Sequence, residues 1–218
     1  MIHALHHIAL QPEGHTPGPH PTMIMVHGRG ADEEDLPGLA AQLDRRLLVL
    51  SVRAPYPFAD GGGYTWYDVG TVGAPEPTMF RESYERLSQF VDDALREYPV
   101  DPTRLFLLGF SMGTVMSLAL GLSRPGVVRG VSANSGYIAE GTHLGYRWNE
   151  LAGASFFIAH GTFDPIIPIV MARRAKELLA ASNAPHVYRE YPMAHQISDE
   201  SLGDIADWLQ PLLAPTGS

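Results

Sequence analysis

Short apolar runs alternate with longer amphipathic segments along the chain. Five runs rich in Val, Ile, Leu or Phe predict strands that are covered on both faces, as in a mostly parallel sheet. They span 22–27, 47–52, 104–109, 127–133 and 155–160. Residues 186–191 alternate between apolar and polar side chains, which favours a position near the sheet edge, and residues 2–10 could add an antiparallel strand.

Between these runs, apolar residues recur at helical spacing. One stripe predicts a long helix that Pro99 ends, and it comprises Phe80, Tyr84, Leu87, Val91, Ala94 and Tyr98. Shorter helices are expected around 36–43, 112–122, 175–179 and 202–209. Alternating strands and helices indicate an α/β fold with right-handed crossovers. Since neither an internal repeat nor a linker is evident, we expect a single domain over residues 1–218 with its core at about 22–210.

The segment 53–78 interrupts this alternation. It carries three consecutive glycines, several prolines, and the aromatic residues Tyr64, Trp66 and Tyr67. A loop of this length inside a compact domain is usually functional or disordered. Its aromatic residues favour an ordered loop that lines a site.

The sequence Gly109-Phe-Ser-Met-Gly113 matches the pattern G-x-S-x-G. It follows a predicted strand and opens a predicted helix, which is the setting of a nucleophile elbow. The glycines permit a sharp turn that lifts the Ser111 hydroxyl above the carboxyl edge of the sheet. A glycine-rich turn with an incidental serine is the alternative.

A serine hydroxyl needs a base to remove its proton. Asp164 follows the strand 155–160, and His195 follows the strand 186–191, so that the order Ser, Asp, His is the one typical of α/β-hydrolases. His195 would accept the proton, and Asp164 would orient the imidazole and stabilise its cation. His160 is expected to support the loop rather than to react.

Each of these assignments has a plainer alternative. Asp164 precedes a proline and could be an ordinary turn residue, and His195 could be a simple loop histidine. Asp199 and Glu200 could replace Asp164 as the acid if the loop that carries Asp164 points away.

An oxyanion needs backbone donors. The N–H of Met112 lies at the predicted start of a helix and would point into the site. A second donor is expected from the loop His27-Gly-Arg-Gly30, with the N–H of Arg29 as the candidate. A glycine-rich turn without this role is the alternative.

The composition narrows the function further. The chain has 218 residues, a formal charge of −9, 45% hydrophobic residues and no cysteine. The acid excess argues against a nucleic-acid partner, and the absence of cysteine excludes disulfides, thiolate nucleophiles and Cys-ligated metals. The sequence lacks an apolar run long enough to span a membrane and a recognisable signal peptide. We therefore expect a soluble cytoplasmic protein.

Other polar clusters indicate neither a metal nor a cofactor. The histidines of the first twenty residues lack a metal-binding spacing and are expected on the surface; they are His3, His6, His7, His15 and His20. The acidic run 32–35 is expected to favour a helix N-terminus. Phosphate-cradling motifs are missing, so that no nucleotide cofactor is predicted.

Six segments together resemble the phospholipase/carboxylesterase family of small serine hydrolases, which includes bacterial carboxylesterases and acyl-protein thioesterases. They are HGRGADEEDL (27–36), WYD (66–68), GFSMGTVMSLAL (109–120), NSGY (134–137), HGTFDPIIP (160–168) and YPMAHQIS (191–198). The resemblance covers residues 22–209 and implies an α/β-hydrolase without a large cap domain. It also implies a Ser111, Asp164 and His195 triad with Arg29 and Met112 as oxyanion donors. Met112 replaces a common Gln and Arg29 a common Leu, which leaves the substrate preference open.

The combined prediction is a serine carboxylesterase that hydrolyses short- to medium-chain esters through an acyl-enzyme. Trp66, Tyr137, Ile166 and Ile167 are the predicted substrate contacts. An acyl-thioesterase or lysophospholipase is the alternative within the family, and a non-catalytic binding protein with a hydrolase fold is the alternative of another class. The expected partner is a small ester, with no membrane span, and the chain is expected to be a monomer or homodimer.

Overall fold

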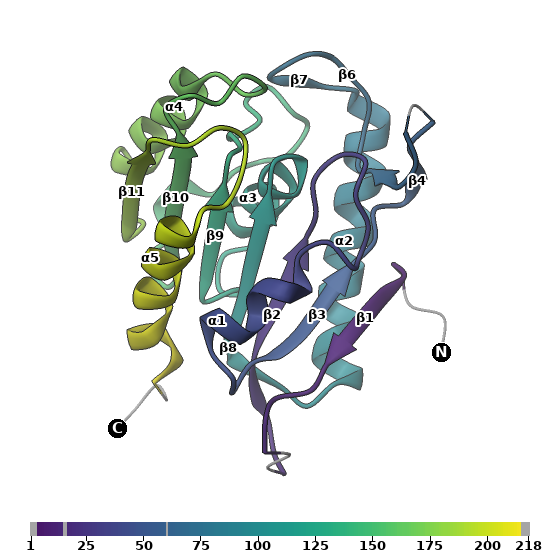
Figure 1. The fold of residues 1–218 in the computed structure, drawn as a ribbon, viewed down its shortest axis with the longest axis vertical. Coiled ribbons are helices and arrows are strands. Elements are labelled where there is room, and N and C mark those ends of the chain that lie inside the picture. Colours follow the sequence, from purple (N-terminus) through teal and green to yellow (C-terminus); the bar gives the residue numbers. More distant parts are fainter. Residues whose placement is uncertain (1–3, 15–16, 60, 215–218) are drawn as a thin grey trace.

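A computed structural model describes residues 4–14, 17–59 and 61–214 of the chain. Its centre is a seven-stranded sheet of order β1-β3-β2-β8-β9-β10-β11, in which β1 pairs antiparallel to β3 and the other neighbours are parallel (Figure 1). In sheet order the strands are β1 (His7–Leu10), β3 (Leu48–Val52), β2 (His20–Val26), β8 (Val100–Phe110), β9 (Gly130–Asn134), β10 (Ser155–Gly161) and β11 (His186–Tyr191). The predicted α/β architecture is confirmed.

Helices cover both faces of the sheet. The helices α2 (Pro77–Glu97), α3 (Met112–Ser123) and α4 (Ile169–Ala180) pack on one face. The opposite face is covered by α1 (Ala40–Leu43) and α5 (Asp199–Leu209). Short 3-10 helices complete the set at Pro37–Leu39 (η1), Trp148–Glu150 (η2) and Gln210–Leu213 (η3).

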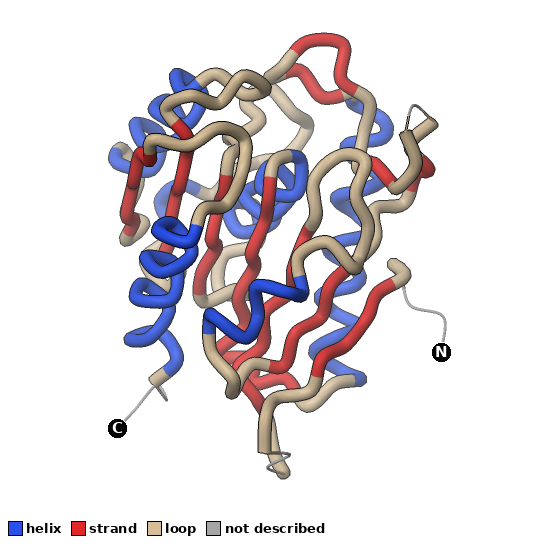
Figure 2. The backbone as a smooth tube through the Cα atoms, viewed as in Figure 1, coloured by secondary structure: helices blue, strands red, loops and turns tan. Residues whose placement is uncertain are grey.

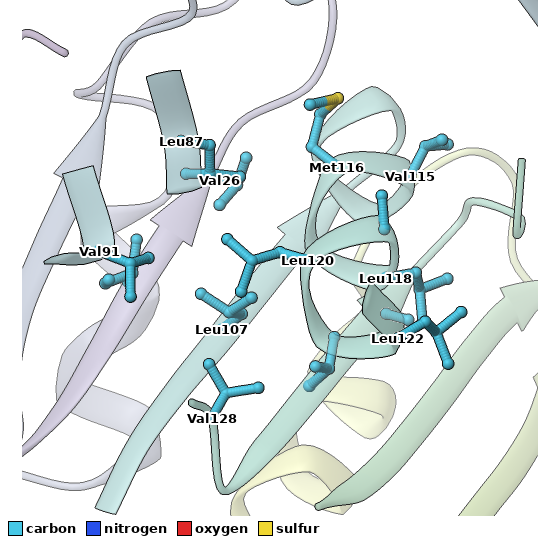
Figure 3. Packing of buried hydrophobic residues seen from close by; sticks show 14 of the residues in the cluster. Val26, Leu87, Val91, Leu107, Val115, Met116, Leu118, Leu120, Leu122 and Val128 are labelled. Carbon is cyan, nitrogen blue, oxygen red and sulfur yellow. The ribbon is translucent and has the colours of Figure 1, made fainter. Parts of the chain in front are cut away.

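The two faces form two hydrophobic cores because side chains alternate along each strand. In β2, Ile24 and Val26 pack under α2 and α3, whereas Met23 and Met25 pack under α1 and α5. Figure 3 shows the first core, where Leu120 of α3 meets Leu107 of β8. This double coverage explains why the strands appear as near-continuous apolar runs in the sequence.

The long helix α2 has clear start and stop signals. The Glu76 carboxylate accepts the N–H groups of Thr78 (3.1 Å) and Met79 (2.7 Å), and Pro77 occupies the first turn. The helix ends before Pro99, as its sequence predicts.

The segment 53–78 has regular structure in its described residues; residue 60 lies outside them. It forms two small hairpins, β4–β5 (Tyr56–Pro57 with Tyr64–Thr65) and β6–β7 (Val69–Thr71 with Ala74–Pro75), and then enters α2 (Figure 2). It is placed at the carboxyl end of the parallel strands. Within the described ranges, no inserted domain covers that end of the sheet.

The remaining sequence predictions are confirmed for the edge strands but not for the acidic run. The edge position of β11 is confirmed, and β1 is antiparallel as expected but covers only 7–10, while residues 2 and 3 lie outside the described part. The acidic run 32–35 does not begin a helix. The next helical element along the chain, η1, starts only at Pro37. Instead Glu33 is almost fully buried and accepts a hydrogen bond from Arg53 Nε at 2.5 Å. The half-buried Arg53 therefore accounts for this acid better than a helix dipole.

The described helices include none with the length and apolar character that a membrane crossing requires.

Candidate active site

The site begins with the turn between β8 and α3. Ser111 has φ 54° and ψ −118°, a left-handed conformation that is rare for a residue with a side chain. A Cβ on Gly109 would lie 2.5 Å from the carbonyl oxygen of Gly113, and a Cβ on Gly113 would lie 1.8 Å from that of Val26. Both glycines are therefore required by close backbone approach, as the sequence pattern predicts.

Hydrogen bonds from β9 fix this strained turn. The N–H of Ser111 donates to the carbonyl of Asn134 at 2.9 Å. Thr114 Oγ contacts the carbonyls of Gly109 (2.8 Å) and Asn134 (2.7 Å), and it also accepts the N–H of Asn134 at 2.8 Å. Such a network over-determines the backbone and holds Ser111 in place.

His195 and Asp164 meet at the same end of the sheet. Asp164 follows β10, His195 follows β11, and His195 Nδ1 lies 2.7 Å from Asp164 Oδ2. Since a carboxylate only accepts, Nδ1 carries the proton and Nε2 is left as an acceptor. The His195 ring lies 4.9 Å from the ring of Phe110, the residue before Ser111. The three residues predicted as the triad are thus gathered beside one turn.

The Asp164 carboxylate is fully buried yet charged. Its other oxygen accepts the N–H groups of Ile166 (2.8 Å) and Ile167 (2.9 Å). Burial alone would raise the pKa of Asp164, but the bonds to His195 and to these two amides outweigh it and hold the pKa below its usual range. The loop is therefore built to present a carboxylate to the imidazole.

The neighbouring groups support this arrangement. His160 is fully buried, and its Nε2 lies 2.9 Å from the carbonyl oxygen of Ile167 and 3.5 Å from Asp164 Oδ2. It holds the loop, as the sequence predicts. Asp199 and Glu200 are exposed in the first turn of α5, so that Asp164 is the acid placed against His195.

The turn His27–Gly30 lies directly beside the elbow. A Cβ on Gly28 would be 3.2 Å from the Cβ of Ser111. His27 is buried, which lowers its pKa, and its neutral ring donates from Nδ1 to the carbonyl of Gly28 (2.6 Å) while Nε2 accepts the N–H of Ala54 (3.0 Å). These bonds fix the turn that carries the predicted oxyanion donor Arg29.

A cavity opens at this point. It measures about 470 Å³ including its opening to solvent, which is within the usual range for small-molecule sites of about 300–1,000 Å³. Its lining is mostly apolar and consists of Arg29, Tyr67, Val69, Val72, Ser111, Met112, Tyr137, Ile166 and Ile167. The predicted nucleophile, both predicted oxyanion donors and three of the four predicted substrate contacts thus share one cavity.

The fourth predicted contact, Trp66, is not part of this lining. Its side chain is completely buried, and its indole N–H donates to the carbonyl of His27 at 2.9 Å. The prediction that Trp66 contacts substrate is wrong for this cavity, because the indole N–H is hydrogen-bonded to the backbone of the turn His27–Gly30. Trp66 supports the turn instead.

Three lining residues were not singled out as substrate contacts from the sequence. Tyr67, Val69 and Val72 belong to the segment 53–78, whose aromatic content was the only signal. Burial raises the pKa of Tyr67 well above its ordinary value, so that its phenol stays neutral. The hairpin β6–β7 therefore builds one wall of the cavity.

The described histidines near the N-terminus, His6, His7 and His20, do not form a cluster. His6 Nε2 lies 3.2 Å from Glu33, and His7 Nε2 lies 2.6 Å from the Tyr98 hydroxyl. His3 and His15 lie outside the described residues. In the part of the chain that the structure describes, no cluster of three potential metal ligands is found.

The parallel sheet flanked by helices, together with a serine at a strained strand-to-helix turn, defines the α/β-hydrolase fold. The chain belongs to the phospholipase/carboxylesterase family, whose model matches residues 13–213. The family predicted from the motifs is thereby confirmed, and membership makes the chain a hydrolase with ester hydrolysis as its general chemistry.

Individual relatives agree with this placement. The chain is 28% identical to the acyl-protein thioesterase 1 of Debaryomyces hansenii over 210 residues, covering 88% of this chain and 90% of the relative. It is 25% identical to the protein of the same name in Candida albicans, with 88% and 91% covered. Among solved structures, the Bacillus cereus carboxylesterase has a TM-score of 0.82 at 24% identity, covering 95% and 94%, and shares the fold. The Mesorhizobium loti carboxylesterase has a TM-score of 0.83 at 21% identity, covering 95% of both chains.

Proposed function

We propose that the protein is a serine carboxylesterase that hydrolyses short- to medium-chain carboxylic esters through an acyl-enzyme. The hydrogen bond between His195 and Asp164, beside the strained Ser111 turn, carries this proposal. A non-catalytic binding protein would need neither a buried, charge-stabilised acid on an imidazole nor a serine in a left-handed conformation.

The proposed reaction has two halves. His195 Nε2 takes the Ser111 proton as the oxygen attacks the ester carbonyl, and the resulting oxyanion is bound by the N–H groups of Met112 and Arg29. Collapse of this intermediate breaks the bond to the alcohol, which leaves with the proton from His195. Water then attacks the acyl-enzyme by the same route and releases the acid and free Ser111. Asp164 stays ionised and stabilises the imidazolium in both halves.

The cavity supports the proposed substrate size. Its walls are apolar side chains from β6–β7 and from the loop after β10, which suit an acyl chain better than a sugar or nucleotide. Ile166 is 56% exposed and Val72 is 42% exposed, so that the cavity is open at this rim rather than sealed. An open rim admits chains of several lengths.

A panel of p-nitrophenyl esters of increasing acyl length tests this function. We expect highest kcat/KM for short and medium chains, and a loss of the order of 10⁵–10⁶ in kcat for Ser111→Ala. Ser201→Ala is a matched control, because Ser201 lies in the first turn of α5 and serves as a capping residue. Undiminished turnover by Ser111→Ala would remove the proposal.

An acyl-thioesterase is the second candidate, and the names of the curated relatives favour it. The same tetrahedral chemistry serves thioesters, oxyesters and lysophospholipids. Turnover of an acyl thioester against the oxyester of the same chain length separates the first two functions. A thioester preference of more than tenfold would favour the thioesterase.

The wider description of the protein remains a prediction. We propose one domain over residues 1–218 with its core at 22–210, a cytoplasmic location, and a monomer or homodimer acting on a small ester. A nucleic-acid partner is disfavoured by the charge of −9.

A further inference from the structure

Arg29 carries the charge of the cavity. Among the described residues that line it, Arg29 is the one ionised side chain, and the others are apolar, phenolic or hydroxyl-bearing. Arg29 is exposed, so that its side chain is accessible to solvent. The backbone role proposed for Arg29 does not need this side chain.

The guanidinium is held without being neutralised. Its carbon lies 4.5 Å from the centre of the Phe58 ring, which supports the planar group through its face. Stacking of this kind leaves the in-plane N–H groups free to bind an anion in a forked arrangement.

Many arginines of the described chain have carboxylate partners, whereas Arg29, like Arg81, Arg86 and Arg129, forms no ion pair there. Examples of the paired arginines are Arg53 with Glu33, Arg124 with Asp92, and Arg173 with Glu190. Over the described ranges, no carboxylate lies within ion-pair distance of Arg29. Because none of the described acids neutralises it, the Arg29 guanidinium is available to bind an anion near the proposed nucleophile.

The acids that follow Arg29 in the sequence do not fill this role. Asp32 Oδ1 accepts the N–H of Glu34 at 3.0 Å, and Glu33 is engaged by Arg53. Asp35 interacts electrostatically with His27, and its partial burial raises the pKa of the Asp35 carboxyl. The positive charge is therefore local, on a protein whose formal charge of −9 otherwise repels anions.

We propose that the Arg29 side chain selects esters that carry an anionic group, a carboxylate or phosphate, within one arginine side chain of the scissile carbonyl. This inference rests on the proposed function, because the N–H of the same residue is the proposed oxyanion donor. Because the backbone and the side chain of one residue would bind the two groups, the length of the arginine side chain limits the distance between the reacting carbonyl and the bound anion. The anion can sit on the acyl part or on the alcohol part, and the two placements call for different substrates.

Two substrate pairs test the placement. For the acyl part, mono-4-nitrophenyl glutarate is compared with its methyl ester, which has the same chain without the charge. For the alcohol part, the butyrate ester of 4-hydroxybenzoate is compared with that of methyl 4-hydroxybenzoate. In each pair the readout is the ratio of kcat/KM for the anionic and neutral esters, measured in wild type, Arg29→Leu and Arg29→Lys.

We expect the ratio to fall about tenfold in Arg29→Leu for at least one pair, mainly through KM, since an exposed charge-assisted contact is worth only a modest factor. Arg29→Lys should recover part of it, because the charge stays while the fork is lost. In wild type the ratio should fall as salt is raised to about 0.5 M. Arg45→Leu removes an equal charge from the exposed pair with Glu13 and should leave the ratio unchanged.

Equal ratios in wild type and Arg29→Leu for both pairs would overturn the inference. A matching loss for anionic and neutral esters would also overturn it, because the arginine would then only hold the turn through Phe58. The proposed function fails separately: it requires that hydrolysis of the neutral esters disappears in Ser111→Ala. If that holds while the ratios stay equal, only the role of the Arg29 side chain is wrong.

Discussion

Gly113 is where the first turn of α3 packs directly against the end of β2, and replacing it by alanine perturbs both elements. An added Cβ would lie 1.8 Å from the carbonyl oxygen of Val26, 2.5 Å from the carbonyl carbon of that residue, and 2.6 Å from the carbonyl oxygen of His27. Side-chain Cβ atoms essentially never approach other heavy atoms below 3.0 Å, so that α3 and β2 must separate by about 1.2 Å. All three contacts are backbone atoms, which cannot rotate away.

This separation should cost both stability and activity. Forced overpacking of a tight core destabilises by up to about 3 kcal/mol, which corresponds to a loss of roughly 6–12 °C in Tm for a domain of this size. The displaced strand end carries the turn of Arg29, and the displaced helix start carries Met112. Because a misplacement of 1 Å can cost about 100-fold in rate, kcat/KM should fall at least 100-fold at temperatures where the variant is folded.

Thermal unfolding by circular dichroism and p-nitrophenyl butyrate hydrolysis measure the two effects. Gly203→Ala is the matched control, since Gly203 is in α5 and nothing lies within 4 Å of an added Cβ. Alanine there should stabilise by up to about 1 kcal/mol through helix propensity and leave kcat/KM unchanged. If Gly113→Ala keeps the wild-type Tm and rate, α3 does not abut β2 as described and the geometric reasoning is wrong.

Three further predictions follow from the same region. Thr114→Val leaves the N–H of Asn134 without an acceptor in a buried position, so that the free energy of unfolding in urea should fall by about 1–3 kcal/mol; an unchanged midpoint would contradict the proposed network. Asp164→Asn should lower kcat by about 10⁴, because the amide cannot stabilise the imidazolium, while KM changes little; a loss below tenfold would argue against the proposed acid. His27 has a folded-state pKa below its ordinary 6.5, so that the unfolded chain takes up this proton first and stability falls as the pH drops below about 6.5. Urea unfolding at pH 5–8 should show this slope reduced in His27→Gln, and an equal slope would contradict the role of burial.

Much of the fold was predictable because its signals are local. The strand runs follow from burial on both faces, and α2 from its apolar stripe and its terminal proline. The edge position of β11 followed from its alternating residues. Details that depend on tertiary partners were not predictable, such as the burial of Glu33 against Arg53 across 20 positions of the sequence.

The candidate site shows the same division. The positions of Ser111, Asp164 and His195 were predictable because each follows a recognisable strand and because parallel strands bring their carboxyl ends to one edge. The role of Trp66 was predicted wrongly, because its sequence context does not indicate that its indole N–H donates to the carbonyl of His27. Val69 and Val72 were missed for the same reason: a short hairpin carries no pattern that tells which of its faces meets a cavity.

Covalent labelling tests the central claim of a Ser111 nucleophile most directly. The protein is treated with a fluorophosphonate, its intact mass is measured, and the modified peptide is mapped. The account predicts one adduct, on Ser111, formed at a rate that His195→Ala lowers at least 100-fold, with no adduct in Ser111→Ala. A label on any other residue, or equal labelling of Ser111→Ala, would contradict it.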